Sequence, residues 1–317
     1  FLSGGGNPDV ITSQIVNRVL IVKGTDHADN IAVAASGSAV AINGDSFNSA
    51  DFDSILIQGN GGDDAILLQS IYVPTSVEGG AGNDLVTLDK SAASVSGGDG
   101  NDTVGMDFID QLSAFDGGNG EDQISVNGGT TLDLTKYPAI EDGKVNSGEI
   151  VGNSLDNHLI LVDGGILSGN GGNDTISGAG GNDILLGGQG NDTLKGISGR
   201  NLLIGGAGAD LLLGGSDDDL LLSGSTIYEG EPVILKALLA EWASVNTYQM
   251  RIDHLTGVAG GGANTSFILS SSTVTNDISA DYLTGNAGRD WFLANSLQDT
   301  ITDQAVDEVF THIDTWL

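Results

Sequence analysis

Between Gly169 and Leu222 the apolar residues recur with a fixed period of nine, in six consecutive units. Each unit opens with a glycine-rich turn and closes with a short apolar run, and its eighth residue is always aliphatic. These eighth residues are Ile176, Leu185, Leu194, Leu203, Leu212 and Leu221. Because side chains alternate between the two faces of a strand, all of them can point into one interior. The pattern predicts short strands separated by tight turns.

Two such units form one coil of strand, turn, strand and turn. A single coil cannot bury its apolar face alone, so successive coils are expected to stack as parallel strands. Stacking also aligns the sixth residues, most of which are acidic. We expect two columns of carboxylates, with Asp174, Asp192 and Asp210 along one edge and Asp183 and Asp219 along the other.

A related pattern with a longer pitch lies between Asp53 and Val126. Its turns begin at Gly59, Gly79, Gly97 and Gly117, at intervals of 20, 18 and 20 residues. The sixth residues are Asp64, Asp84, Asp102 and Asp122, and the eighth are Ile66, Val86, Val104 and Ile124. One glycine turn per coil predicts a single acidic edge here. The fold class predicted is all-β: a right-handed parallel β-helix that continues into a β-roll.

Two gaps of 35 residues interrupt the pattern, from Gly24 to Gly59 and from Gly117 to Gly152. Each gap is long enough for two coils whose turns no longer match the motif. Residues 1–23 precede the pattern, with a glycine-rich extended lead-in over 1–9 and a strand over 15–22.

The pattern changes again after Ser223. Leu235, Leu238 and Trp242 are spaced as on one face of a helix that starts near Pro232, and a second helix is expected over 247–255. We interpret this segment as a cap whose helix pair covers the last open coil. The predicted division of the chain is therefore 1–23, 24–168, 169–222 and 223–317, with a small α+β cap as the last part.

Stacked carboxylates repel one another unless a positive charge lies between them. The available ligands are hard oxygen donors, since the chain has no cysteine and its four histidines are scattered. This set favours several Ca²⁺ ions over zinc or copper. A metal-free solenoid with solvated acidic edges is the alternative. The candidate metal ligands are Asp64, Asp84, Asp102, Asp122, Asp174, Asp183, Asp192, Asp210 and Asp219.

Some units depart from the motif. Asn201 replaces the sixth-position aspartate and follows Arg200, whose guanidinium can take the place of an ion. Asn157 stands at the same position in the unit that begins at Gly152, where no ion is expected. In the unit that begins at Gly285, Arg289 is expected to form a salt bridge with the neighbouring Asp290.

The units resemble the repeats-in-toxin (RTX, hemolysin-type) nonapeptide G-G-x-G-x-D-x-U-x. The resemblance implies a Ca²⁺-binding parallel β-roll in which sixth-position carboxylates and turn carbonyls of adjacent coils share each ion. Residues 238–255 and 283–293 also resemble the terminal module of large secreted, repeat-rich proteins of planctomycete-type bacteria.

A formal net charge of −33 makes nucleic acid and anionic membrane surfaces poor partners. No run of eighteen apolar residues exists that could span a bilayer. Without a cation the acidic coils are expected to unfold, so ion binding and folding become one event. Free Ca²⁺ reaches the required concentrations outside cells, which predicts an extracellular or cell-surface location. The resemblance implies in addition a secreted bacterial protein.

The motifs HExxH, G-x-S-x-G and the Walker loop are absent, as is a cysteine nucleophile. We therefore name no catalytic and no cofactor-binding residues, and we expect no enzymatic activity. Stacked turns bring many carboxylates close together by geometry alone, so their proximity does not indicate a glycosidase.

Three functions remain to be weighed. The first is a non-catalytic calcium-binding structural or surface protein, which could assemble end to end into filaments or matrix through its open strand edges. The alternative is a calcium-dependent folding and secretion module of a larger secreted enzyme such as a protease, a lipase or a polysaccharide-active enzyme. The third is a β-helix carbohydrate enzyme, which the 10 Lys+Arg and 5 % aromatic residues disfavour.

Overall fold

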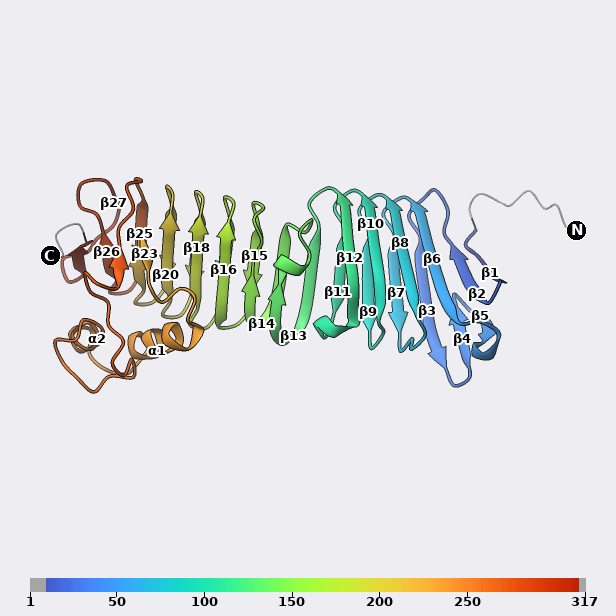
Figure 1. Ribbon diagram of the computed structural model, residues 1–317, viewed down its shortest axis with the longest axis horizontal. Helices are drawn as coiled ribbons and strands as arrows, with labels where there is room; N and C mark the ends of the chain where they lie inside the picture. Colours follow the sequence, from blue (N-terminus) through green and yellow to red (C-terminus); the bar gives the residue numbers. More distant parts are fainter. Residues whose placement is uncertain (1–9, 314–317) are drawn as a thin grey trace, which may run out of the picture. The chain divides into compact units, whose positions relative to one another are not determined.

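The computed structural model describes residues 10–313, in which strands predominate (Figure 1). The predicted lead-in over 1–9 lies outside the described residues. The chain divides into two compact units. Unit 1 comprises Phe1–Thr130 with Ala139–Asp142, and unit 2 comprises Thr131–Pro138 with Gly143–Leu317. Each unit is built from stacked parallel strands, which confirms the predicted parallel β-solenoid.

Unit 1 contains two sheets. In the first, the strand order is β1-β2-β6-β8-β10-β12, and in the second β3, β7, β9, β11 and β13 pair in sequence, in parallel. The strands are β1 Thr12–Val16, β2 Val19–Lys23, β3 Asn30–Ser36, β4 Ala39–Ile42, β5 Asp45–Asn48, β6 Ser54–Gly61, β7 Ala65–Gln69, β8 Thr75–Ala81, β9 Leu85–Asp89, β10 Ala93–Asp99, β11 Thr103–Met106, β12 Leu112–Asn119 and β13 Gln123–Asp133.

The first 35-residue gap holds one coil, so the prediction of two was wrong. Strand β2 pairs directly with β6 and β3 with β7, each in parallel. The surplus residues form the antiparallel strands β4 and β5, which are joined by a tight turn at Asn43 and Gly44. Both turn residues have positive φ, 46° and 101°, as a two-residue hairpin of this type requires.

The single strand predicted over 15–22 is likewise a hairpin. Its turn residues Asn17 and Arg18 have φ of 49° and 63°, and β1 runs antiparallel to β2. Only Asn17 and Arg18 interrupt the apolar residues here, and no glycine marks the turn, because asparagine can adopt the left-handed conformation itself.

Unit 2 also contains two parallel sheets. One joins β14, β16, β18, β20, β22, β26 and β28, and the other joins β15, β17, β19, β21, β25 and β27. The elements are β14 Asp142–Val151, β15 His158–Leu161, β16 Gly165–Gly171, β17 Thr175–Gly178, β18 Ile184–Gln189, β19 Thr193–Ile197, β20 Leu202–Ala207, β21 Leu211–Gly215, β22 Leu220–Leu222, β23 Ser225–Thr226, α1 Pro232–Trp242, α2 Tyr248–Leu255, β24 Val274–Thr275, β25 Tyr282–Asn286, β26 Trp291–Ala294, β27 Thr300–Ile301 and β28 Val309–His312.

The core of each unit follows the predicted period. All the eighth-position residues of both patterns are at most 2 % exposed. In unit 2, Leu185 pairs with Leu203 and Ile176 with Leu194, so the apolar layers repeat every eighteen residues. Burial of these aliphatic side chains supplies the main favourable free energy of folding.

The two predicted helices are present, but they do not cover the last coil. After them the solenoid resumes, since β25 pairs with β21 and β26 with β22 (Figure 1). The helices instead pack on the outer face of the sheet that contains β18, β20 and β22. There Leu238 and Trp242 join the seventh- and ninth-position residues Ile184, Leu186, Leu202, Ile204, Leu220 and Leu222 in one buried cluster.

The sequence contains a signal for this packing. The units that form β18, β20 and β22 are apolar at their seventh and ninth positions, whereas those that form β17 and β19 carry Thr175, Ser177, Thr193 and Lys195 there. A strand that is apolar on both faces needs cover on both. Over the described part of the chain, no helix has the length and apolarity needed to cross a membrane.

Candidate calcium-binding edges

The aspartates of unit 1 form one hydrogen-bonded column. The Oδ1 atom of each accepts the backbone N–H of the equivalent residue in the preceding coil, with N–O distances of 2.8 Å from Asp64 to Asp84, 2.7 Å from Asp84 to Asp102 and 2.8 Å from Asp102 to Asp122. Asp29 continues the column through a 2.7 Å bond from its N–H to Asp64. The structure thus brings all four predicted residues of this unit together along a single edge.

Unit 2 has two such columns. The first edge joins Asn157, Asp174, Asp192, Asp210 and Asp281, through amide-to-Oδ1 distances of 2.7 to 2.8 Å. The second edge joins Asp183, Asn201, Asp219 and Asp290, with distances of 2.6 to 2.9 Å. Both predicted groupings of aspartates are therefore present.

The second carboxylate oxygen of these residues is buried and has no hydrogen-bond partner. Eleven stacked aspartates share this property: Asp64, Asp84, Asp102, Asp122, Asp174, Asp183, Asp192, Asp210, Asp219, Asp281 and Asp290. Each of them is at most 2 % exposed. A buried polar atom without a partner is costly, and the cost is greater when the group is charged.

The unpaired oxygens face other acceptors. A β-carbon placed on Gly79 would lie 2.2 Å from Asp84 Oδ2 and 2.6 Å from the carbonyl oxygen of Gly97. At Gly214 the corresponding distances to Asp219 Oδ2 and to the carbonyl oxygen of Gly285 are both 2.6 Å. The carboxylate oxygen and the carbonyl oxygen thus both lie against the opening glycine, at a position where a β-carbon would clash with them.

Burial raises the pKa of these carboxyl groups. The backbone N–H that each Oδ1 accepts works against this effect without cancelling it, so the pKa rises to about 6 for Asp64, Asp102 and Asp192, to about 7 for Asp174, Asp183, Asp281 and Asp290, and to about 8 for Asp210 and Asp219. The cause is desolvation, which disfavours the charged form. Each Oδ2 atom therefore requires a positive partner, either a proton or a cation.

The donor set fits Ca²⁺. This ion accepts six to eight oxygens, from carboxylates and backbone carbonyls, at about 2.3–2.6 Å. Among the described residues no group of three or more His, Cys, Asp or Glu side chains could hold a metal, so any such site must use backbone carbonyls beside its carboxylates. When bound, Ca²⁺ supplies the positive charge that compensates the buried carboxylates.

Asn201 provides an internal control for this argument. Its Oδ1 atom accepts the N–H of Asp183 at 2.9 Å, like an aspartate of the column, but its Nδ2 atom donates to the carbonyl oxygen of Gly199 at 3.0 Å. The amide thus provides its own donor where the carboxylates have none. In the same way, Asn157 donates from Nδ2 to Asn153 Oδ1 at 3.1 Å. That neither asparagine binds an ion stays a prediction, which these bonds support.

A second ladder connects the residues just before the aspartates, and sequence reasoning missed it. Asn83 Oδ1 accepts the N–H of Asn101 at 2.7 Å, and Asn173 Oδ1 accepts that of Asn191 at 2.9 Å. Here a side chain accepts from the following coil, whereas the aspartates accept from the preceding one. The two ladders therefore connect consecutive turns in opposite directions. The sequence signal for the second ladder is the frequent Asn just before the sixth-position Asp.

Asp281 was also missed, because its turn lacks the opening glycine. Its signal is weaker: an aspartate two residues before the buried Leu283, the spacing found in most other units. Asp281 Oδ1 accepts the N–H of Asp210 across a sequence separation of 71 residues, which contains both helices. Local sequence alone does not show that the chain returns to the same column.

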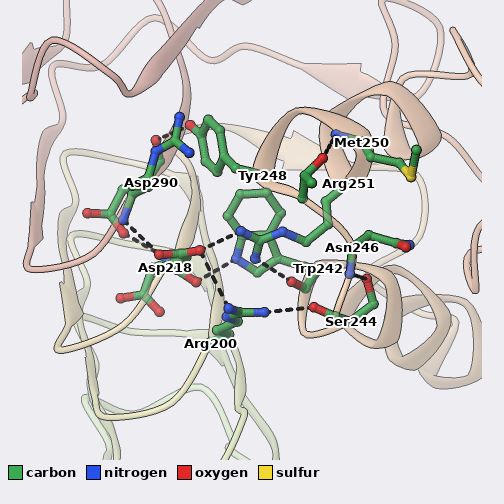
Figure 2. Close-up of polar contacts among 12 residues, drawn as sticks. Arg200, Asp218, Trp242, Ser244, Asn246, Tyr248, Met250, Arg251 and Asp290 are labelled. Atoms are coloured by element: carbon green, nitrogen blue, oxygen red, sulfur yellow. Dashed lines mark hydrogen bonds and ion pairs between the residues drawn. The ribbon is translucent and has the colours of Figure 1, made fainter.

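Arginines gather beside the second edge (Figure 2). The carboxylate of Asp218 binds Arg251 Nη2, accepts the N–H of Arg289 at 2.9 Å and lies 3.7 Å from Arg200 Nη2. The Arg251 side chain is 2 % exposed and lies over the Trp242 ring, 4.6 Å from its centroid. Burial alone would raise the pKa of Asp218, but the bonds from Arg251 and the Arg289 amide outweigh it and lower that pKa.

The expected salt bridge between Arg289 and Asp290 is not present. Arg289 instead pairs with Asp307, with Nε 3.0 Å from Oδ2, and stacks on the Tyr248 ring at 4.3 Å. The reason is that Asp290 is buried just before β26, where its Oδ1 atom accepts the N–H of Asp219, whereas the Arg289 side chain is 46 % exposed. Asp290 therefore belongs with the other aspartates that have an unpaired Oδ2.

The fold and these edges define a class of protein, the calcium-binding parallel β-solenoids. The profile of the RTX calcium-binding nonapeptide repeat (HemolysinCabind) matches four segments of the chain, residues 76–104, 163–194, 195–225 and 278–301. The chain thus carries RTX calcium-binding repeats, which confirms the resemblance seen in the sequence. No curated protein matches the chain significantly.

Proposed function

We propose that this chain is a non-catalytic extracellular structural or surface protein whose solenoid folds when Ca²⁺ binds to its stacked turns. The observation that carries the proposal is the set of eleven buried Oδ2 atoms without a partner. Without the ion, each edge accumulates buried negative charge. With it, the charge is compensated and the aliphatic layers can stack, so binding stabilises the folded state directly.

The two oxygens of each aspartate have separate roles in this proposal. Oδ1 holds the register between coils through its bond to a backbone amide. Oδ2, together with turn carbonyls, holds the ion. The ligands would be the nine aspartates predicted from the sequence, with Asp281 and Asp290 in addition. An ion shared between coils then ties each turn to the next and stiffens the solenoid.

Several features support a structural role outside the cell. The same repeat builds the strands of both units, and RTX repeats are generally found in secreted proteins. Weak calcium sites of this open, oxygen-rich kind are filled at extracellular concentrations, about 10⁻⁴–10⁻³ M. Among residues 10–313, strand β1 is the last strand of the first sheet of unit 1 and pairs on one side only, so its other side is a candidate edge for association with another copy.

A calcium titration of the chelated protein tests the proposal. Far-UV circular dichroism should show less β-structure in EGTA than in Ca²⁺ and a cooperative gain as Ca²⁺ approaches millimolar concentration, and calorimetry should show several ions bound per chain. An unchanged spectrum in EGTA, with no heat of binding, would contradict it. Electron microscopy in Ca²⁺ tests assembly separately, since short monodisperse particles would argue against filaments but not against calcium-coupled folding.

A further inference from the structure

Unit 1 has a groove at the corner of its coils that lies opposite the acidic edge. The loops after β7, β9 and β11 form one side, and the outer faces of β6, β8 and β10 form the other. Its volume is about 990 Å³. None of the aspartates with an unpaired Oδ2 lines it, so the groove is separate from the candidate calcium sites.

Neutral side chains hold this corner in place. Ser91 Oγ accepts the N–H of Ile71 at 2.8 Å, and Gln111 Nε2 donates to the carbonyl oxygens of Leu88 at 2.9 Å and Ser91 at 3.3 Å. Gln111 Oε1 accepts the N–H of Phe108 at 2.9 Å. The three loops are thus joined by satisfied hydrogen bonds without an ion, which makes the groove preorganised for a ligand.

Two aromatic side chains stand exposed on these loops. Tyr72 is 82 % exposed and Phe108 is 62 % exposed, although both belong to a chain that buries most of its large apolar residues. Their loops lie two coils apart, with the loop after β9 between them, which corresponds to roughly 10 Å at the spacing of paired strands. Between them, Lys90 has a left-handed backbone with φ of 51°. Exposed rings on a rigid, partly strained corner indicate a binding surface.

The charge of the groove differs from that of the chain. The only charged residues that line it are Lys90 and Asp110, of opposite sign, whereas the chain as a whole carries −33. Serine hydroxyls line it on successive coils, at Ser54, Ser76, Ser94 and Ser113. A complementary ligand is uncharged, offers many hydroxyl groups and has flat apolar faces.

These features point to a sugar chain. A pyranose ring has an apolar face that packs on an aromatic ring, and its hydroxyls can bond to serine. A peptide strand is a poorer match, because β8 is already paired with β6 and β10 and has no free backbone edge. We propose that this groove binds a neutral polysaccharide, with Tyr72 and Phe108 stacked against separate sugar rings. The proposal does not rest on the calcium-dependent structural role.

Affinity electrophoresis of the full chain in saturating Ca²⁺ tests the proposal. Native gels containing hydroxyethyl cellulose, xylan or galactomannan should retard the protein in at least one case, and gels containing alginate should not. If none of the three neutral polymers retards it, or if alginate alone does, the groove does not bind a neutral sugar chain.

Variants then locate the binding surface. Tyr72→Ala and Phe108→Ala should each weaken binding to the retarding polymer about tenfold, whereas Tyr72→Phe should keep most of the affinity because stacking needs only the ring. Tyr282→Ala is the matched control, since this tyrosine of unit 2 is 54 % exposed but lies outside the groove. Unchanged affinity in both alanine variants, with circular dichroism showing a folded protein, would overturn the assignment.

Discussion

The two edges of unit 2 are built on the same coils and the same core, but they balance their charge differently. Both use an aspartate ladder with nearly equal distances. On the first edge the residues before the aspartates are uncharged, Asn173, Asn191 and Ala209. On the second edge the residues just before the column residues are Asn182, Arg200, Asp218 and Arg289, and the last three of these are charged. On this edge Arg200 and Arg251 compensate the carboxylate of Asp218, whereas the Oδ2 atoms of Asp219 and Asp290 stay without a partner, as on the first edge. The arginines thus balance only the charge that lies beside the column.

The helices explain why the second edge changes. Arg251 comes from α2, and its Nη1 atom donates to the carbonyl oxygen of Trp242 at the end of α1 at 2.8 Å. The indole of Trp242 donates in turn to the carbonyl oxygen of Asp218 at 2.7 Å. The helix pair is thus attached to this edge through buried charge and hydrogen bonds. We infer that residues 196–294 depend less on calcium than residues 169–195.

The largest effect should come from chelation. In EGTA, hydrogen exchange should show that amides of residues 169–195 lose most of their protection, together with the acidic coils of unit 1. Amides of α1, α2, β22 and β26 should keep more, because arginines and the buried aromatic cluster hold them. Equal loss of protection in all these elements would show that the second edge has no stability of its own.

The next largest effect is expected from Arg251→Met. The change leaves the partly buried carboxylate of Asp218 without its main partner, which should cost about 3–5 kcal/mol of unfolding free energy. Because the pair contains no metal, the loss should be similar in Ca²⁺ and in EGTA, as measured by urea denaturation followed through tryptophan fluorescence.

Arg18→Met is the matched control for that variant. Arg18 also pairs with an aspartate, Asp53, but both side chains are more than half exposed, at 56 % and 70 %. Its removal should therefore change the free energy of unfolding far less than Arg251→Met does. If both arginine variants lose the same free energy of unfolding, the burial of the Arg251–Asp218 pair does not increase its contribution to stability.

The period of nine predicted the core, the strands and the two acidic edges of unit 2, because each of these follows from local alternation and stacking. The return of the chain to the same column at Asp281 could not be predicted in this way, since it depends on packing between residues 71 apart. The number of coils in the first gap was predicted wrongly for a related reason. The length of the gap fitted two coils as well as one coil with an insertion, and only the pairing of β2 with β6 decides between them.

The site was partly predictable as well. Nine candidate ligands follow from the sixth position of the motif, and the structure places all nine in columns. What the sequence does not show is that one oxygen of each aspartate is used by the backbone and the other is left unpaired. The different roles of Oδ1 and Oδ2 depend on which neighbouring coil donates its backbone N–H, and only the stacked structure shows this.

A smaller effect should follow from exchanging the column residues. Asn201→Asp replaces an amide that supplies its own donor with a carboxylate that lacks one. In EGTA it should destabilise the protein by about 1–3 kcal/mol, the cost of one unsatisfied buried group, and Ca²⁺ should restore most of the loss. Thermal unfolding with and without Ca²⁺ measures the difference.

Asp192→Asn makes the reverse exchange on the first edge. It should stabilise the chelated protein slightly and reduce the number of ions that calorimetry detects. The same change at the exposed Asp45 should alter neither quantity, because this residue lies on the hairpin strand β5, outside the acidic columns. If Asp192→Asn leaves both the ion count and the chelated stability unchanged, the unpaired oxygen of that residue does not bind calcium.

The last test concerns pH in the absence of calcium. Burial raises the pKa of Asp210 and Asp219 to about 8 in the folded protein, above the ordinary value of 3.8. Between these values the folded state binds more protons than the unfolded state, so the chelated protein should become more stable as the pH falls from 8 to 5. In saturating Ca²⁺ the trend should reverse, because protons then compete with the ion. Urea midpoints measured at pH 8, 6.5 and 5, with and without Ca²⁺, test both trends. If the chelated protein becomes less stable on acidification, these carboxyl groups are not desolvated in the folded state.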